Sequence, residues 1–238
     1  MITFDDGYFN NTLALPVLRE YRAPAAFFVS TGPVLRNECF WWDVVYREMR
    51  KAGKPRAKIK KEVDALKMRK SVEIARFIRQ AFGEKALLPQ SDADRPFSPG
   101  ELRDFAREPF VHIGNHTRSH AILTNYSAAE ACEEIAQAQR DLLDLACAEP
   151  IAISYPNGSF GRETICAARQ CGLKLGIATI GLKNYLPIDT HGDEVFRLKR
   201  FTLSEHKDLA AQCDSFRSDA RLIKTLRRIA PPWRSLAY

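Results

Sequence analysis

The sequence predicts an α/β protein built on a mostly parallel sheet or barrel. Short apolar runs alternate with amphipathic stretches along most of the chain. This alternation is typical of parallel sheets, because parallel strands need crossover connections that are usually helical. In addition, three polar motifs each follow directly after an apolar run, which is where α/β barrels assemble their sites. Residues 40–105 break the alternation, and we interpret them as a helical insertion in a single domain that spans residues 1–238.

The predicted elements begin with a strand, a helix and a second strand, which form one β-α-β unit. The apolar runs are short, as expected for buried strands, and the amphipathic stretches have helical spacing. We expect strands at residues 2–4, 25–30, 110–113, 151–155 and 173–179. We expect helices at about residues 11–21, 127–147 and 163–171. The insertion is charged and helical, with a Pro-, Asp- and Ser-rich interruption at residues 88–99.

The composition is that of one globular domain. Of 238 residues, 45% are hydrophobic and 27% are charged, which excludes a fibrous or wholly disordered chain. No apolar run approaches the roughly 20 residues that cross a bilayer, and no secretory signal pattern follows Met1. The sequence as written is therefore expected to be cytoplasmic. The first turn signal lies only a few residues after Met1, so the natural protein could start further upstream. For this reason, association with the cell envelope is also possible.

Six cysteines are scattered along the chain, and none forms a CxxC pair. A chain of this length folds without disulfide bonds, so we expect these cysteines to be reduced and mostly buried. Their distribution points to a reducing compartment.

The net charge of +7 is concentrated in two segments. Residues 46–80 hold 13 Lys or Arg against four acids, a local charge of +9, and residues 217–234 carry +5. The rest of the chain therefore carries −7. A solvated helical face is the commonest explanation of such a run. However, few acids are available for i,i+4 pairing, which leaves charge for an anionic partner.

Three motifs at predicted strand ends carry the residues that could do chemistry: Asp5-Asp6-Gly7, the segment from Asn115 to His120, and Pro156-Asn157-Gly158. The carboxyl ends of barrel strands form one rim, so these motifs are expected to converge. His116 and His120 are spaced so that one turn aims both imidazoles to the same side. A carboxylate from another loop would complete a three-ligand metal site with an open position. Two ordinary loop histidines are an equally good interpretation of the spacing alone.

Asp5 and Asp6 are adjacent at a strand end, where neighbouring side chains point to opposite faces. One can ligate a metal while the other acts as general base, and the physics leaves open which aspartate has which role. The alternative interpretation is an Asp-Gly turn with solvated carboxylates, which is the commoner fate of this tripeptide.

Together these residues resemble a known family. Thr3-Phe4-Asp5-Asp6-Gly7 and His116-Thr117-Arg118-Ser119-His120 are similar to the first two signature motifs of the polysaccharide deacetylases, carbohydrate esterase family four. The resemblance implies a distorted (β/α) barrel with fewer than eight strands. It also implies that Asp5 is the general base. By the same resemblance, the ligands of a divalent metal, usually zinc, are Asp6, His116 and His120.

The third family motif matches the segment from Ser154 to Gly158. The resemblance gives the backbone N–H of Asn157 a role in holding the oxyanion, and it assigns Tyr155 and Pro156 to the substrate. Ser154 stands where the family usually has an arginine that orients the base. Arg197 or Arg200 could supply that charge from a later strand, and we select Arg200.

Two features fit the family less directly. The last family motif, a Leu-x-His whose histidine is the general acid, has no clear match. His191 and His206 are the only later histidines, and Asp5 could serve both proton transfers instead. In Phe40-Trp41-Trp42-Asp43 the aromatic residues are expected to be core, with contact between Trp41 and a sugar as the minority interpretation.

The sequence therefore predicts a metal-dependent hydrolase that removes N-acetyl groups from amino sugars of a polysaccharide or its precursor, with Zn²⁺ as the expected metal. One alternative is a catalytically inactive relative that binds carbohydrate. The other is a binder of anionic surfaces or nucleic acid through the basic segments, although no nucleic-acid motif is recognisable. We expect the basic insertion to guide an acidic polysaccharide, a phosphate-linked glycan precursor or an anionic membrane surface.

Overall fold

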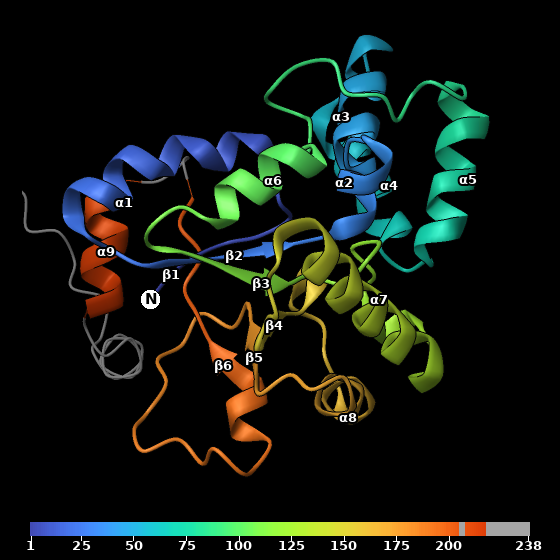
Figure 1. Ribbon diagram of the computed structural model, residues 1–238. Coiled ribbons are helices and arrows are strands. Elements are labelled where there is room, and N and C mark those ends of the chain that lie inside the picture. The colour runs from blue at the N-terminus through green and yellow to red at the C-terminus, as the bar shows by residue number, and fades with distance from the viewer. Residues whose placement is uncertain (205–207, 218–238) are drawn as a thin grey trace, which may run out of the picture.

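The computed structural model describes residues 1–204 and 208–217 and has a six-stranded parallel sheet at its centre (Figure 1). The strands follow one another in the sheet in the same order as in the chain, and every neighbouring pair is parallel. The sheet therefore curls into a half-barrel with β1 and β6 at its two edges. The strands are β1 (Ile2–Phe4), β2 (Ala25–Val29), β3 (Val111–Asn115), β4 (Ala152–Ser154), β5 (Leu175–Ala178) and β6 (Leu198–Lys199). The predicted barrel with fewer than eight strands is confirmed.

Helices cover the sheet and connect the first five strands, whereas a long loop that ends in a 3₁₀ segment connects β5 to β6 (Figure 1). Those outside the insertion are α1 (Leu15–Tyr21), α2 (Thr31–Arg36), α7 (Ala128–Ala146), α8 (Arg162–Gln170) and α9 (Leu209–Arg217). Short 3₁₀ segments are η1 (Phe9–Ala14), η2 (Leu123–Asn125), η3 (Pro156–Gly158) and η4 (Glu194–Arg197). The helix predicted at 127–147 is confirmed as α7. It starts at this point because Ser127 and Glu130 form a capping box.

The strands predicted at 25–30, 151–155 and 173–179 are each one to three residues shorter in the structure, and two further boundaries differ for identifiable reasons. The helix expected over residues 11–21 is a 3₁₀ segment followed by the α-helix α1, which begins beside Pro16. Proline has no N–H to donate, so it suits the first turn of an α-helix and not its middle. The strand expected from Phe110 begins instead at Val111, because Phe110 has a φ of 70°, which lies outside the strand region.

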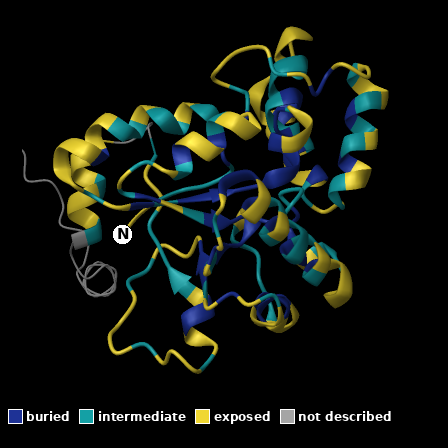
Figure 2. Ribbon diagram, in the orientation of Figure 1, coloured by how far each residue is buried: buried dark blue, intermediate teal, exposed yellow. Residues whose placement is uncertain are grey.

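Two clusters of buried apolar residues form the core around the sheet, and α7 contributes to both. One cluster packs Phe27, Phe97 and Phe105 with Leu142 of α7, and the other packs Ile135 and Ile153 with residues of α8. Strand β2 is almost wholly buried, as Figure 2 shows for the centre of the sheet. Its continuous apolar sequence is typical of a parallel strand covered on both faces.

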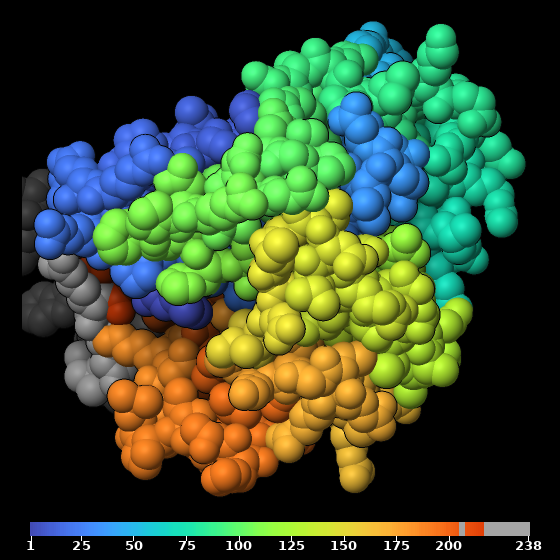
Figure 3. All heavy atoms as spheres, in the orientation of Figure 1, coloured from blue at the N-terminus to red at the C-terminus, as the bar shows by residue number. Residues whose placement is uncertain are grey.

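The predicted insertion separates into two parts. Its first three helices, α3 (Trp41–Lys51), α4 (Arg56–Leu66) and α5 (Ser71–Phe82), pack around their own apolar cluster, which extends from Cys39 to Leu87. We call this unit the α3–α5 cluster; it forms the lobe at the upper right of Figure 3. Its last helix, α6 (Pro99–Ala106), contributes Leu102 and Phe105 to the main core.

The basic run of the α3–α5 cluster is more extensively paired than its composition suggests. Lys60 lies 2.6 Å from Asp64 within α4, and Lys70 lies 2.6 Å from Glu130 of α7. Arg47 contacts Asp94 at 2.8 Å. Acids from outside the run thus neutralise part of it. Residues 218–234 of the second basic segment lie outside the described residues.

All six cysteines are free. Cys39 is buried, whereas Cys147, Cys166 and Cys213 are exposed, so the expectation of mostly buried cysteines holds only in part. Cys132 and Cys171 are half-buried, with their sulfur atoms 3.4 Å apart. Among the described residues, the helices are too short or too polar to cross a bilayer.

Candidate metal centre and active site

The first motif forms a tight turn directly after β1. Asp6 and Gly7 have φ values of 77° and 91°, and the Asp6 carbonyl accepts a hydrogen bond from Ser30 N at 3.0 Å. A Cβ at position 7 would lie 2.8 Å from Val29 Cγ1. Glycine is therefore required both for the left-handed backbone and for the close approach to β2. This turn sends Asp5 and Asp6 in different directions at the carboxyl end of the sheet.

The second motif leaves β3 as a loop whose backbone is fixed by side chains. His116 N donates to Val29 O at 3.2 Å, which keeps the residue beside β2. Farther along the loop, Ser119 N and Oγ donate to the Glu134 carboxylate of α7 at 2.9 and 2.7 Å. Ala121 N donates to Thr117 Oγ1 at 2.8 Å. These bonds stabilise a loop in which Thr117 and His120 adopt positive φ values of 61° and 52°.

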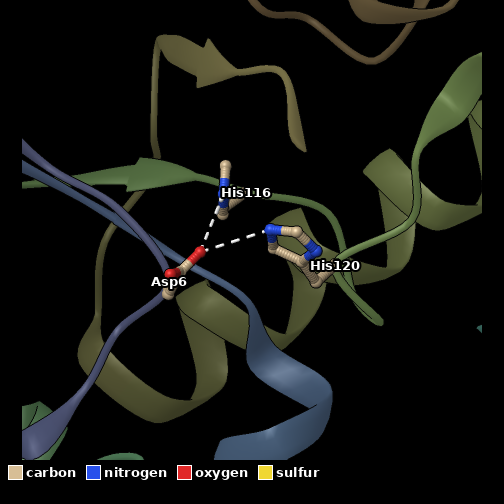
Figure 4. Close-up of side chains that lie close together, drawn as sticks. All are labelled: Asp6, His116 and His120. Atoms are coloured by element: carbon tan, nitrogen blue, oxygen red, sulfur yellow. Dashed lines mark ion pairs between the residues drawn. The ribbon is translucent and has the colours of Figure 1, made fainter. Parts of the chain in front are cut away.

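The side chains of Asp6, His116 and His120 converge from these two loops (Figure 4). Asp6 Oδ1 lies 3.2 Å from His116 Nε2 and 3.3 Å from His120 Nε2. His116 is buried, with 1% of its side chain exposed, while Asp6 retains 23%. The group therefore has one solvent-facing side, through which water or a substrate can reach it.

The hydrogen bonds of His116 test whether this group suits a cation. His116 Nδ1 lies 2.7 Å from Ser154 O, and a carbonyl only accepts, so Nδ1 carries the proton. In the neutral ring, Nε2 then presents a lone pair toward an Asp6 oxygen that also only accepts. A cation between these atoms resolves the conflict. One carboxylate and two imidazoles are a donor set that zinc prefers, so the residues fit a divalent metal.

Electrostatics keep the carboxylate of this group ionised. Burial alone would raise the pKa of Asp6, but the hydrogen bonds and charges of the two histidines outweigh it and hold that pKa well below its ordinary value. Burial dominates at His120 and lowers its pKa. The pKa of His116 is raised, because the negative charges of Asp5 and Asp6 outweigh burial.

Asp5 lies beside this group and is held by Arg200, which follows β6. Arg200 Nη1 donates to Asp5 Oδ1 at 2.8 Å, and Nη2 donates to Oδ2 in a bidentate pair. Ser154 Oγ donates to Asp5 Oδ2 at 3.2 Å and accepts from Arg200 Nη2 at 2.9 Å. Arg200 Nη1 also reaches Thr3 Oγ1 at 2.9 Å. The serine at the expected arginine position thus helps to hold an arginine that comes from another strand.

The remaining predicted residues lie at differing depths near the end of β4. Asn157 is exposed and has a φ of 58°. Tyr155 and Pro156 are buried, and the Tyr155 ring packs against Phe160 in the core at 5.3 Å between centroids. Both side chains are buried, so the prediction that Tyr155 and Pro156 contact substrate disagrees with their position. His191 is exposed in a distant loop, and His206 lies outside the described residues.

Residues 1–176 match the family model of the polysaccharide deacetylases. The chain belongs to the polysaccharide deacetylase family. The match ends before β6, so the arginine that holds Asp5 lies beyond the part of the chain that the family model covers.

Solved structures of other proteins have the same fold. The deacetylase PplD of Streptococcus pyogenes, in complex with acetate, has a TM-score of 0.57 at 16% identity, covering 90% of this chain and 68% of that chain. A polysaccharide deacetylase from Bacillus cereus has a TM-score of 0.58 at 15% identity, covering 91% of this chain and 50% of that one. The BpsB deacetylase domain from Bordetella bronchiseptica gives 0.53 at 18%, covering 84% and 69%. A comparison with curated proteins gave no match.

Sequence reasoning missed how the α3–α5 cluster contributes to the candidate site. Trp42 packs on His120, with ring centroids 4.5 Å apart, and its Nε1 donates to Tyr8 Oη at 2.9 Å. Tyr8 Oη donates in turn to Asp43 Oδ2 at 2.6 Å. The signal was present in the sequence, because Tyr8 follows the first motif directly. Trp41, the residue selected for a sugar contact, is half-buried and lines a pocket that also includes His120 and Phe40.

Proposed function

We propose that this chain is a divalent-metal-dependent hydrolase that removes N-acetyl groups from amino sugars of a polysaccharide or its precursor. The observation that carries the proposal is the convergence of Asp6, His116 and His120 beside an Asp5 carboxylate held by Arg200. Ligands and base thus lie together on one rim of the sheet, as an amide hydrolase requires.

Asp6 Oδ1 and the Nε2 atoms of the two histidines are the proposed metal ligands, with zinc as the preferred metal. Such a cation supplies Lewis acidity, which polarises an amide carbonyl and acidifies water. The hydrogen bond from His116 Nδ1 to Ser154 O, at 2.7 Å, fixes the tautomer that leaves Nε2 free to bind.

Asp5 is the proposed general base. The bidentate contact with Arg200 fixes the plane of the carboxylate, and Ser154 Oγ adds a further donor to Oδ2. In the reaction, a carboxylate oxygen of Asp5 takes a proton from water as the water oxygen bonds to the amide carbon. The C–N bond then breaks, and the proton passes to the amine nitrogen, so that acetate and a free amine leave. One carboxylate can make both transfers without a separate acid.

The exposed backbone at Asn157 is the proposed donor to the developing oxyanion, with its N–H as the donating group. Asn157 and Gly158 both have positive φ values, 58° and 68°, and glycine is required at position 158, where a Cβ would lie 1.9 Å from Thr179 Oγ1. The acetate in the Streptococcus pyogenes complex is the product that this reaction would release, which supports an N-acetyl substrate here.

The inactive carbohydrate-binding alternative is less well supported, because the ligands, the base and the arginine are all present and in contact. For the exposed basic face of α4 we propose contact with an acidic or phosphate-linked glycan. The paired lysines of the run weaken the case for an anionic membrane surface, and a nucleic-acid partner has no motif to support it.

The test is acetate release from N-acetylated oligosaccharides and peptidoglycan fragments by the Zn²⁺-loaded protein. We expect His116→Ala and Asp6→Ala to lose metal and activity together, since each removes one of three ligands. Asp5→Asn should keep the metal and lose acetate release by about 10²-fold or more, the scale of a positioned base. Full metal occupancy in His116→Ala would contradict the ligand assignment. An active Asp5→Asn protein would contradict the base.

A further inference from the structure

The two histidines of the proposed metal centre are held in different ways. His116 donates from Nδ1 to a backbone carbonyl, the usual second contact of a metal-binding histidine. His120 Nδ1 is buried and has no hydrogen-bond partner among the described residues. Some other interaction must therefore set the orientation of the His120 ring.

Aromatic rings of the α3–α5 cluster supply that interaction. The His120 ring lies 4.5 Å from the Trp42 ring and 6.1 Å from the Phe40 ring, at interplanar angles of 61° and 77°. Phe40 and Trp42 stack on each other at 4.7 Å. Tilted and edge-to-face arrangements of this kind are the favoured geometries for π systems. Only 12% of the His120 side chain is exposed, so the rings enclose it closely.

Trp42 is itself fixed in orientation. Its indole N–H donates to Tyr8 Oη, and Tyr8 Oη donates to Asp43 Oδ2, one residue farther along α3. The Tyr8 ring also packs on Phe40 at 4.7 Å. This closed set of contacts joins the turn that carries Asp6 to the start of α3. The aromatic rings consequently have a fixed position relative to both metal-ligand loops.

The backbone of His120 is fixed, so the side-chain torsions are what remain to be restrained. Its φ of 52° is held by the neighbouring bonds of Thr117 and Ser119. With the backbone set, the direction of Nε2 depends on the two side-chain torsions of the histidine. The ring contacts with Phe40 and Trp42 restrict those torsions.

We propose that Trp42, backed by Phe40, is a positioning residue for the metal centre, which makes metal affinity depend on the α3–α5 cluster. Trp42 replaces by packing the hydrogen bond that His120 Nδ1 does not make. The inference rests on the proposed Asp6, His116 and His120 metal site, and it adds to that site a component from the insertion.

The experiment measures Zn²⁺ affinity by competition with a chelator, and thermal unfolding with and without Zn²⁺. Trp42→Leu removes the ring, and Trp42→Phe keeps a ring in its place. Phe77→Leu is the matched control: it removes a half-buried ring from the same cluster, where Phe77 contacts Phe82 and Arg69 and not the site. A merely structural role would lower the melting temperature of the metal-free protein in both leucine variants alike.

We expect Trp42→Leu to raise the Zn²⁺ dissociation constant by about 10- to 100-fold, the usual effect of removing a supporting contact of a metal ligand. Its stabilisation by Zn²⁺ should shrink accordingly. Trp42→Phe should recover most of the affinity, and Phe77→Leu should bind as the parent does. Parent-like Zn²⁺ affinity in Trp42→Leu, or an equal loss in Phe77→Leu, overturns the inference and leaves the metal centre intact. A parent protein that binds no Zn²⁺ overturns the metal centre itself.

Discussion

Arg200 makes the contact with Asp5 that the family resemblance led us to expect from an arginine at the position of Ser154. Ser154 occupies that motif position, and its small side chain leaves room for a guanidinium that enters after β6. The charge therefore reaches Asp5 by another route through the fold. The Asp5 carboxylate needs a guanidinium that donates two parallel hydrogen bonds, and the strand from which this guanidinium comes does not matter.

Replacing Arg200 with lysine tests this requirement. Arg200→Lys retains the charge but cannot make the bidentate contact, so we expect turnover to fall about tenfold or more while Zn²⁺ binding is kept. Acetate release and metal content are measured on the same samples. Arg197→Lys is the control, because Arg197 contacts Asp193 at 3.5 Å and lies outside the site. Equal turnover in the two variants would remove Arg200 from the active site.

Asp43 gives a prediction about pH. Its pKa is raised from 3.8 to about 6, chiefly by burial; the charges of Asp6 and Asp94 act in the same direction, and the hydrogen bond from Tyr8 and the charge of Arg47 oppose them. Between these values the folded state keeps a proton that the unfolded state has lost. The stability that Asp43 contributes is thus fully present below pH 3.8 and is lost as pH rises through about 6.

Asp43→Asn should remove that loss. We expect the free energy of unfolding of the variant, relative to the parent, to increase from pH about 4 to about 7 and then level off. The gain should be about 1 kcal/mol, since partial exposure screens the charge. Urea unfolding across this range measures it, with the exposed Asp144→Asn as control. A difference that does not vary with pH would mean that Asp43 does not titrate there.

Chemistry-bearing residues were largely predictable from the sequence, and their surroundings were not. Asp6, His116 and His120 follow short apolar runs at recognisable spacing, and the structure brings one ligand atom of each within 4.8 Å of the others. The choice of Arg200 over Arg197 was a selection between neighbours. Burial of Tyr155 could not be foreseen, because an aromatic residue at a strand end is equally compatible with core and with surface.

At the scale of elements, helix α7 supports the loop that carries His120. Glu134 accepts two hydrogen bonds from Ser119 through its carboxylate, and its backbone carbonyl accepts one from Arg118 N at 3.1 Å. A long helix of the main core thus fixes a loop at the rim. The hydrogen bonds between Ser119 and the Glu134 side chain hold the loop against the folded helix α7.

Glu134→Ala should loosen the loop while leaving α7 folded. Two donors of Ser119 lose their acceptor, so we expect a loss of about 1–3 kcal/mol of stability and weaker Zn²⁺ binding. Chemical unfolding and chelator competition measure the two effects. Glu133→Ala is the control, because Glu133 lies on the solvent face and contacts Gln137 and Arg140. Identical Zn²⁺ affinity in the two variants would show that the loop needs no support from α7.

Periodicity predicted the positions of helices and strands correctly where a local sequence signal marks the boundary of the element. The start of α7 coincides with a capping box, which is readable in the sequence. The division of the predicted helix into η1 and α1 reflects Pro16, which has no backbone N–H to donate. The late start of β3 reflects the positive φ of Phe110. Both are backbone effects that a count of apolar residues does not detect. Likewise, α6 joins the main core through tertiary contacts, although its charge pattern resembles that of the insertion.

At the scale of the molecule, the basic charge of the α3–α5 cluster is the feature still open to a partner. Lys60 and Lys67 share Asp64, whereas Arg56, Lys58 and Lys61 are exposed and make no ion pair among the described residues. Arg50, Lys54 and Arg76 of the same run are also exposed without an ion pair among the described residues, and α4 carries three such residues on one helix. Electrostatic steering of substrate should therefore depend in large part on α4.

Reversing Arg56, Lys58 and Lys61 to glutamate tests the steering. We expect KM for an acidic polysaccharide to rise several-fold at low salt, and added salt to produce the same rise in the parent. Turnover of a small neutral acetylated sugar should be unchanged. The control reverses Arg103 and Arg107 of the α6 region, away from this face. Equal KM values for parent and variant at low salt would leave α4 as an ordinary solvated helix.

The contact between Arg200 and Asp5 also has a consequence for the growing polypeptide. The two residues are 195 positions apart, at opposite edges of the sheet. As the ribosome synthesises the chain from its N-terminus, His120 completes the proposed ligand set long before β6 emerges. A nascent chain can thus acquire its cation-binding side chains while the base still lacks its arginine. The contact between Arg200 and Asp5 forms only when β6, the last strand among the described residues, has docked on the sheet.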